Sequence, residues 1–270
     1  MSMPYFRPGD DPGANFPELL RRVGLGPVLS PAGSEALTGI PHATTCVAVR
    51  YADGVVMAGD RRATSGNLIS HRTMEKVLPA DRHSGVAIAG AAGPAMDMVK
   101  LFQLQLEHYE KVEGVELSLE GKANQLAAMV RANLPAAMQG LVVVPIFAGY
   151  DSRRAVGRLF AYDVTGGRYE EKDTVATGSG SLHAGTVIKI GFKPRLTRGE
   201  AVDLCVRALW EAADSDSATG GPDPLRGIYP VVATISAEGF EPVADAELAE
   251  RFAAVAQATQ PVGGTEGTLS

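Results

Sequence analysis

A threonine, an aspartate and a lysine at the start of the regular part of the chain could together form a nucleophilic site. Thr44 and Thr45 open an apolar strand pattern, Asp60 closes the next one, and Lys76 stands at the head of a third. A threonine hydroxyl is a poor nucleophile until a base removes its proton. A free α-amine, with a pKa of about 7.7–8.0, can be that base if the threonine is the first residue of the mature chain. The three residues therefore fit an N-terminal threonine nucleophile.

Asp60 and Lys76 could tune such a nucleophile. A lysine beside the amine and the hydroxyl would lower the pKa of both groups, and an aspartate would keep that lysine charged and oriented. An aspartate at the end of an apolar strand also needs a cation or amide donors if it is buried. Each residue has an ordinary structural explanation when it is taken alone, because threonine pairs favour strands and charged residues often support a fold.

The first 43 residues have the composition of a removable leader. They contain 7 of the 17 prolines and 6 of the 31 glycines, which interrupt every short apolar piece, so no stable helix or strand is expected there. A leader that ends directly before a threonine would keep the nucleophile inactive until cleavage. We expect a propeptide over residues 1–43, a catalytic domain over residues 44–258 and a disordered tail over residues 259–270.

Other common catalytic and ligand-binding signatures are missing from the sequence. It has no G-x-S-x-G, C-x-x-C or H-E-x-x-H pattern, and G-S-G-S at residues 178–181 is too short for a phosphate-binding loop. None of the five histidines stands in an obvious catalytic context. Cys46 and Cys205 lie in apolar patterns, which favours buried thiols over a disulfide or a metal pair. We expect neither a metal nor a cofactor.

Composition and charge indicate a globular protein of a reducing compartment. Of the 270 residues, 45% are hydrophobic and 21% are charged. The formal net charge of −6 gives no electrostatic case for binding nucleic acid or an anionic membrane. No apolar run reaches the roughly 18 residues of a membrane span, and the first residues lack the layout of a secretory signal. We expect a cytoplasmic protein.

The elements that must position the candidate residues alternate in blocks of strands and paired helices. The first long helical pattern places Met96, Val99, Leu101, Leu104 and Tyr109 at near-helical spacing. Helices in pairs, rather than one per strand, favour two packed antiparallel sheets with helices outside over a doubly wound parallel sheet. The expected strands are 45–51, 54–60, 84–93, 141–151, 157–167 and 229–236, and the expected helices are 94–114, 119–140, one after 181, and 198–214.

Several stretches together resemble the β subunits of actinobacterial proteasomes. They are TTCVAVRYADGVVMAGDRRATSGN (44–67), EKV (75–77), AIAGAAGPAMDM (87–98), LEHYEKVEG (106–114), AAMQGLVVVPIFAGYD (136–151), ATGSGS (176–181) and DSDSATGGPDPLRGIYP (214–230). The match spans nearly all of residues 44–240, and this combination of motifs is highly specific, whereas any one alone is weak. The resemblance implies the N-terminal nucleophile hydrolase fold, an α+β four-layer αββα sandwich of two antiparallel sheets between helix layers.

The resemblance also implies catalytic roles. Thr44 matches the nucleophile whose freed amine is the base, and Asp60 and Lys76 match the charged pair behind it. A polar group that orients the amine and its water is matched by Ser179, Asp216 and Thr219; the family most often has serine at the last position, and both residues supply a hydroxyl.

Substrate contacts follow in the same way. Gly90 matches the glycine whose backbone N–H faces the developing oxyanion, and Thr64 matches a residue whose main chain pairs with the bound peptide as an added strand. The positions that match the lining of the first specificity pocket are Ala63, Met74, Ile88 and Ala92. An apolar pocket predicts cleavage mainly after hydrophobic residues.

One residue departs from the family pattern. Leaders of the family usually end in glycine, but here Ala43 precedes Thr44. Self-cleavage needs a tight turn before the threonine, which glycine adopts most easily. We expect alanine to be tolerated at the Ala43–Thr44 cleavage site and to slow maturation. Cleavage at another bond would leave Thr44 blocked and the subunit inactive.

The activity implied is that of a threonine-type endopeptidase, a zymogen activated by autocatalytic cleavage. The implied partners are proteasome α subunits and other β subunits in stacked heptameric rings (α7β7β7α7), a ring ATPase, and unfolded substrates or substrates carrying a prokaryotic ubiquitin-like tag (pupylated proteins). Two alternatives remain. The bacterial two-ring ATP-dependent threonine protease is shorter, has no long leader and usually has G-D-G-Q in place of GDRRAT. A non-catalytic structural ring subunit would not need the intact site.

Overall fold

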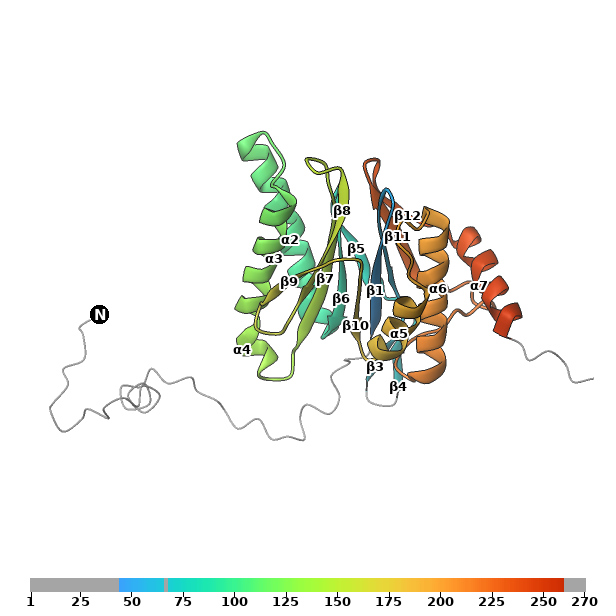
Figure 1. The fold of residues 1–270 in the computed structure, drawn as a ribbon. Helices are drawn as coiled ribbons and strands as arrows, with labels where there is room; N and C mark the ends of the chain where they lie inside the picture. Colours follow the sequence, from blue (N-terminus) through green and yellow to red (C-terminus); the bar gives the residue numbers. More distant parts are fainter. Residues whose placement is uncertain (1–43, 66–67, 260–270) are drawn as a thin grey trace, which may run out of the picture. The chain divides into compact units, whose positions relative to one another are not determined.

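Two five-stranded antiparallel sheets pack face to face within residues 44–65 and 68–259, which the computed structural model describes (Figure 1). These residues belong to one compact unit. In order across the first sheet the strands are β10 (Thr174–Gly178), β1 (Thr45–Tyr51), β2 (Gly54–Gly59), β11 (Val231–Ser236) and β12 (Gly239–Pro242). In order across the second they are β5 (Val77–Asp81), β6 (Ser84–Gly90), β7 (Val143–Asp151), β8 (Val156–Tyr162) and β9 (Arg168–Glu171). A separate hairpin joins β3 (Ala63–Ser65) and β4 (Leu68–His71).

Helices cover the outer face of each sheet (Figure 1). On the second sheet, the helix residues Phe102 and Leu126 pack against the strand residues Phe147 and Phe160. Among the described residues, no helix is long and apolar enough to cross a membrane. The expected α+β sandwich of two antiparallel sheets between helix layers is confirmed. The layer on the second sheet contains α2 (Ala92–Glu113), α3 (Leu119–Ala132) and α4 (Leu134–Ala137), and the layer on the first contains α5 (Ser181–Gly191), α6 (Arg198–Ser215) and α7 (Asp245–Thr259).

Strand β1 is apolar on both faces because both faces are covered. Cys46 and Ala48 point into the core between the two sheets, where residues such as Ile146 meet them. Val47 and Val49 belong to the core beneath α5, α6 and α7. Since successive side chains of a strand alternate between its faces, a strand covered on both sides needs a nearly continuous apolar run.

Local signals fix several helix ends. Helix α2 ends at Glu113 and is capped by Gly114, which has a φ of 71° and donates its N–H to the carbonyl oxygen of Glu110. The left-handed conformation makes glycine the favoured residue at this position. Helix α6 begins with a capping box in which the Thr197 and Glu200 side chains each accept from the other residue's backbone N–H.

The structure corrects one expected helix and adds several elements that were not expected. The helix expected over residues 119–140 ends at Ala132, and the short α4 begins at Leu134. Pro135 explains the break, because proline has no N–H and its ring clashes with the preceding turn of a continuous helix. The strands β3, β4, β9, β10 and β12 and the helix α7 were not expected. The strand expected over residues 84–93 ends at Gly90, because α2 begins at Ala92, and α7 includes Thr259, the first residue of the expected tail. Expectations for residues 1–43 and 260–270 lie outside the described residues.

The sheet topology brings the ends of several strands to one place. At the start of β1, Thr45 pairs with Gly178 at the end of β10, and Cys46 pairs with Gly59 at the end of β2. In the second sheet, the start of β5 lies beside the end of β6. A direct contact between Lys76 and Asp60 joins these two groups of strand ends. The candidate residues from both sheets therefore meet at one edge of the sandwich.

Candidate active site

The backbone of Thr44 is fixed by the turn that follows β10. Ser179 donates its backbone N–H to the carbonyl oxygen of Thr44 over 2.8 Å, and Thr44 is only 4% exposed. Gly178, the first glycine of G-S-G-S, has a φ of 98°, and a Cβ atom built on it would lie 1.8 Å from the same carbonyl oxygen. Only a residue without a side chain allows this close approach.

Four hydrogen-bond donors surround the buried carboxylate of Asp60. Its Oδ1 accepts from the Lys76 ammonium over 2.7 Å and from the Thr45 N–H over 2.9 Å. Its Oδ2 accepts from the backbone N–H groups of Arg62 and Gly220, both over 2.9 Å. We call Asp60 and these four donors the Asp60 cage. The expectation that a buried Asp60 would need a cation or amide donors is confirmed, and the structure supplies both.

Asp60 and Lys76 form an ion pair that is closed to solvent. Both side chains are 0% exposed, and the Lys76 ammonium also donates to the carbonyl oxygen of Arg62 over 2.5 Å. Removing two charges from water is costly unless the pair has good geometry and further hydrogen bonds, and both conditions hold here. Because Oδ1 of Asp60 contacts Lys76 and the Thr45 N–H together, the buried positive charge lies directly behind the first residues of β1.

The buried thiol of Cys46 is a poor candidate for the nucleophile of this site. Burial raises the pKa of the Cys46 thiol to about 12, and the nearby Lys76 charge opposes this only in part. The thiol donates to the carbonyl oxygen of Ile88 over 3.5 Å. A neutral, buried thiol is unreactive at neutral pH. Cys205 is also buried and unpaired, so the expectation of two buried thiols is confirmed.

A second polar cluster contains Ser179, whose backbone N–H contacts the Thr44 carbonyl oxygen. Oδ2 of Asp216 accepts from the Ser179 hydroxyl over 2.5 Å and from the Thr219 hydroxyl over 2.6 Å. Its Oδ1 accepts from the Ala218 N–H over 3.1 Å. We call Asp216 and these three donors the Asp216 cluster. The structure thus brings G-S-G-S and D-S-A-T together beside the Thr44 carbonyl, as the resemblance implied.

The ionisation of Asp216 should leave a signature in the acid stability of the fold. Burial acts to raise the pKa of Asp216, but hydrogen bonds from Ser179, Thr219 and the Ala218 N–H outweigh it and hold the pKa below its ordinary value of 3.8. A carboxyl group with a lowered pKa stabilises the fold above its unfolded-state value, and that stability is lost as the pH falls through the folded-state value.

We therefore expect Asp216→Asn to reduce the loss of stability that acid causes. Its unfolding temperature should fall less steeply than that of the wild type between about pH 5 and pH 3. Thermal unfolding across this range measures the slope. The exposed Asp214 provides the matched control, Asp214→Asn. Equal slopes in the wild type and Asp216→Asn would contradict the prediction.

Gly90 ends β6 in a conformation that favours glycine. Its φ is 109°, and a Cβ atom built on it would lie 2.0 Å from the carbonyl oxygen of Val142. The next residue, Ala91, donates its N–H to this same oxygen over 2.7 Å. The backbone of Gly90 is therefore pressed against the start of β7, at the edge of the sandwich that holds the two clusters. The role of its N–H toward an oxyanion stays a prediction.

Gly90→Ala should impair both stability and turnover. A methyl group at this position must displace backbone atoms, which we expect to cost about 1–3 kcal/mol of unfolding free energy. If the Gly90 N–H is an oxyanion donor, its displacement should lower kcat for a small peptide about 10²-fold. The control is Gly93→Ala in α2, where an added Cβ meets nothing within 4 Å. Turnover of Gly90→Ala equal to that of Gly93→Ala would argue against an oxyanion role.

The five predicted substrate-binding residues fall into two groups. Ala63 and Thr64 lie on β3 and are largely buried. Met74 and Ile88 pack into the core beneath α2, and Ala92 is the first residue of that helix. The second group is apolar, as the predicted pocket requires. That both groups line one pocket stays a prediction.

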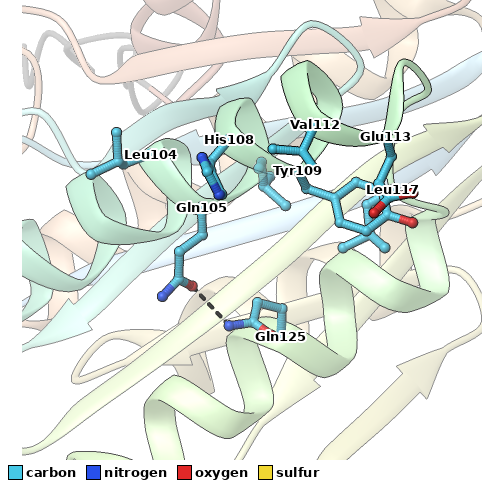
Figure 2. Close-up of a pocket in the computed structure, with 9 residues that line it drawn as sticks. Leu104, Gln105, His108, Tyr109, Val112, Glu113, Leu117 and Gln125 are labelled. Carbon is cyan, nitrogen blue, oxygen red and sulfur yellow. Dashed lines mark hydrogen bonds between the residues drawn. The ribbon is translucent and has the colours of Figure 1, made fainter.

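A separate groove lies between α2 and α3 and contains none of the predicted site residues (Figure 2). It encloses about 590 Å³, and the Gln125 side chain donates to that of Gln105 across it over 2.8 Å. Leu104 and Val112 on its wall are 62% and 65% exposed. The full lining is Leu104, Gln105, Leu106, His108, Tyr109, Val112, Glu113, Leu117 and Gln125. This groove lacks the lysine, carboxylate and hydroxyl arrangement found at Thr44.

Sequence comparison identifies the family. The family described as "Proteasome subunit" matches residues 40–223. The chain belongs to the proteasome subunit family. Residues of both polar clusters lie inside the matched segment, so the geometry around Thr44 is part of the proteasome-like region of the chain.

Relatives in this family are proteasome β subunits from actinobacteria. "Proteasome subunit beta" of Acidimicrobium ferrooxidans is 56% identical over 263 residues, which cover 97% of this chain and 96% of the relative. The Streptomyces griseus protein of the same name is 59% identical, with 78% and 75% covered. That of Acidothermus cellulolyticus is 53% identical, with 91% and 86% covered. The resemblance to actinobacterial proteasome β subunits is therefore confirmed, and the chain is a proteasome core subunit of the β type.

Several residues of this proteasome subunit that matter to the site were not assigned a role from its sequence. Thr45 contributes its N–H to the Asp60 cage and its hydroxyl to Thr219. Gly178 lets the backbone approach Thr44, and Gly180 donates its N–H to the Thr45 hydroxyl over 3.0 Å. The signals were present in T-T and G-S-G-S, but residue types alone do not show which hydrogen bonds each threonine makes or which glycine contacts it.

Proposed function

We propose that this chain is a catalytic β subunit of a 20S proteasome core particle, and that Thr44 hydrolyses peptide bonds as an N-terminal nucleophile. The Asp60 cage and the Asp216 cluster, which meet at Thr44 and Thr45, carry this proposal. One supplies a buried ammonium group, and the other supplies hydroxyl groups around an ionised carboxyl. Such an arrangement suits a threonine whose own amine is the base, because no histidine is then required.

Maturation is the first reaction that we assign to Thr44. Its Oγ attacks the carbonyl carbon of Ala43, an ester to Oγ forms, and the amide bond between Ala43 and Thr44 breaks. The hydroxyl proton passes to the Thr44 nitrogen as this bond breaks, which frees the α-amine. Water then hydrolyses the ester, which releases residues 1–43 and restores the Thr44 hydroxyl. Before this step the nitrogen is an amide without useful basicity, so the attached leader keeps the subunit inactive.

Peptide hydrolysis uses the freed amine. It takes the proton of the Thr44 hydroxyl, directly or through a water molecule, and Oγ attacks the substrate carbonyl. The Gly90 N–H donates to the oxyanion of the tetrahedral intermediate. Collapse expels the leaving amine, which takes up the proton, and leaves an ester on Oγ. Water activated by the same amine hydrolyses this ester and restores the enzyme.

The Asp60 cage and the Asp216 cluster have different roles in the proposed mechanism. Lys76, held charged by Asp60, favours the deprotonated forms of the Thr44 hydroxyl and amine through its positive charge. Ser179, Asp216 and Thr219 fix the carbonyl of Thr44 and orient the amine and its water. The bound peptide adds as a strand beside Thr64, with an apolar side chain toward Met74, Ile88, Ala63 and Ala92. Cleavage is expected mainly after hydrophobic residues.

Assembly into rings would restrict which proteins reach the proposed active site. We propose heptameric β rings stacked between α rings, in the cytoplasm, with a ring ATPase that feeds unfolded or pupylated substrates. Family membership supports association with other proteasome subunits. A broad peptidase must be kept from folded cellular proteins, and enclosure in a chamber achieves that. No cofactor or metal takes part in the proposed steps.

Two other functions predict different behaviour. A non-catalytic ring subunit would keep its leader or would show no turnover after losing it. A two-ring protease would form active particles without α subunits. We favour a catalytic subunit because the site's hydrogen bonds are intact and a purely structural subunit does not need them. The residues involved are Asp60, Lys76, Ser179, Asp216 and Thr219.

Intact mass and N-terminal sequencing after co-expression with the cognate α subunit test the proposed function. We expect a new N-terminus at Thr44, particles of the α–β type, and hydrolysis of small hydrophobic peptides. A full-length chain that hydrolyses peptides would contradict the mechanism. A new terminus at any residue other than Thr44, combined with activity, would contradict it as well.

A further inference from the structure

The side chain of Thr45 lies between the two polar clusters. Thr45 is 0% exposed. Its N–H donates to Oδ1 of Asp60 over 2.9 Å, which places it in the Asp60 cage. Its hydroxyl lies 2.6 Å from the hydroxyl of Thr219 and accepts from the N–H of Gly180 over 3.0 Å. Thr45 is thus hydrogen-bonded both to the cage and to a member of the Asp216 cluster.

Counting hydrogens fixes the direction of this chain of hydrogen bonds. An ionised carboxylate only accepts, so the single hydroxyl hydrogen of Thr219 goes to Oδ2 of Asp216. The Thr219 oxygen must then accept in its 2.6 Å contact, which makes the Thr45 hydroxyl the donor. The Gly180 N–H in turn donates to the Thr45 oxygen. Every donor along this path therefore points toward Asp216.

The same count fixes the orientation of Ser179. Its hydroxyl hydrogen goes to Asp216 over 2.5 Å, whereas its oxygen lies 3.4 Å from the Thr44 carbonyl oxygen. The shorter contact, to a charged acceptor, is the stronger one. The Ser179 oxygen then presents lone pairs, rather than a hydrogen, to groups near Thr44. In the proposed mechanism, the freed α-amine of Thr44 can donate one N–H to this acceptor, and its lone pair is then directed toward the Thr44 hydroxyl.

We propose that Thr45 is a positioning residue for the threonine reaction, whose hydroxyl links the Gly180 N–H to Thr219 and thereby holds the loop that places Ser179 between Asp216 and Thr44. This inference rests on the proposed function of Thr44. Gly180 is the link to Ser179, because the two residues are adjacent in G-S-G-S. The fit is close: a Cβ atom built on Gly180 would lie 2.4 Å from the Thr45 hydroxyl oxygen and 2.7 Å from that of Thr219.

The contribution of Thr45 is chemical and does not come from its shape alone. Valine has nearly the same shape as threonine but has neither a donor for Thr219 nor an acceptor for the Gly180 N–H. The Gly180 N–H would then lose its acceptor and the Thr219 oxygen would lose its donor, although Thr219 would still donate to Asp216, and the loop that carries Ser179 would relax. Since Thr45 is closed to solvent, its side chain does not face the bound peptide, so substrate affinity should be preserved.

The test uses the full chain, co-expressed with the α subunit, with processing checked by intact mass. We expect Thr45→Val to lower kcat for a small peptide about ten- to hundredfold, with KM within about twofold of the wild type. Thr45→Ser, which keeps the hydroxyl, should retain most of the turnover. The matched control is Thr234→Val on β11, another buried threonine (3% exposed), whose hydroxyl contacts only a backbone carbonyl among the hydrogen bonds described; we expect its kinetics to be unchanged.

A comparison of Thr45→Ser with Thr45→Ala keeps the test decisive if Thr45→Val does not assemble. Thr45→Ser and Thr45→Ala both lose the methyl group, and only serine keeps the hydroxyl, so we expect the serine variant to turn over about ten times faster. Equal turnover of the two, or wild-type kcat in Thr45→Val, would overturn the inference. So would assembly that fails in every variant lacking the hydroxyl and succeeds with serine, because that outcome makes Thr45 structural. Failure of the proposed function would instead appear in the wild type, as a missing terminus at Thr44 or missing turnover.

Discussion

Thr44→Ala is expected to abolish peptide hydrolysis and to leave the first 43 residues attached. The substitution removes Oγ, which both proposed reactions need, and keeps the backbone carbonyl that accepts from the Ser179 N–H. The pairing of Thr45 with Gly178 does not involve the lost atoms either. The chain should therefore fold and assemble. Loss of the nucleophile from a hydrolytic site typically lowers turnover on the order of 10⁶-fold.

Intact mass and peptide hydrolysis on the same preparation measure the two effects together. The control is Thr44→Ser, which retains a hydroxyl on the same backbone and should process its leader and cleave peptides within about tenfold of the wild-type rate. Peptide hydrolysis by assembled Thr44→Ala would rule out Thr44 as the nucleophile. Leader removal in Thr44→Ala would show that another protease, or another residue, performs the maturation.

Much of the sandwich could be predicted from sequence because its strands carry strong local signals. The turn at Ala52 and Asp53 joins two apolar runs, and the structure pairs them as β1 and β2. Helix faces were harder to predict. Leu101 and Leu104 stand at near-helical spacing with Val99, but they are 48% and 62% exposed, whereas Val99 is buried. Periodicity identifies a helix, but the choice of buried stripe depends on tertiary packing that a single sequence does not contain.

In the site, too, local sequence patterns predicted some contacts but not those between residues far apart in the chain. That a buried Asp60 would need donors followed from its place at the end of an apolar strand. Lys76 was a plausible partner, since it opens the next apolar stretch. The Gly220 N–H, however, comes from 160 positions further along the chain, and no local pattern links it to Asp60. The hydroxyl contact between Thr45 and Thr219 spans 174 positions and was not anticipated.

Stability and activity are therefore coupled at this edge of the sandwich. The carboxylate of Asp60 joins the first sheet to Lys76 of the second, and it also anchors the start of β1 through the Thr45 N–H. A change in the cage should disturb the packing of the two sheets and the position of Thr44 together. Separating the effect on stability from the effect on activity requires another buried lysine that is paired with a carboxylate and lies away from Thr44.

Lys76→Met is expected to have the second large effect, on both stability and turnover. It removes the cation from a pair in which both side chains are 0% exposed, so Asp60 keeps a buried charge with only amide donors. Breaking a buried pair in this way typically costs about 3–5 kcal/mol of unfolding free energy. Loss of the positive charge beside the hydroxyl and amine should lower kcat/KM by about 10²–10⁴-fold. Chemical denaturation and peptide hydrolysis measure the two losses.

Lys122→Met separates the catalytic part of this effect from the structural part. Lys122 is also buried, with its side chain 4% exposed, and it contacts Asp81 over 2.5 Å and Glu116 over 3.3 Å. Asp81 ends β5, whereas Lys76 precedes the same strand, so this pair lies at the other end of the strand from Thr44. We expect Lys122→Met to lose several kcal/mol of stability and, once assembled at a temperature where it is folded, to keep near-wild-type turnover.

Equal loss of turnover in Lys76→Met and Lys122→Met would mean that the Asp60 cage acts on catalysis only through the stability of the fold. A preserved rate in Lys122→Met, beside a lost rate in Lys76→Met, would place the Lys76 charge in the chemistry of Thr44.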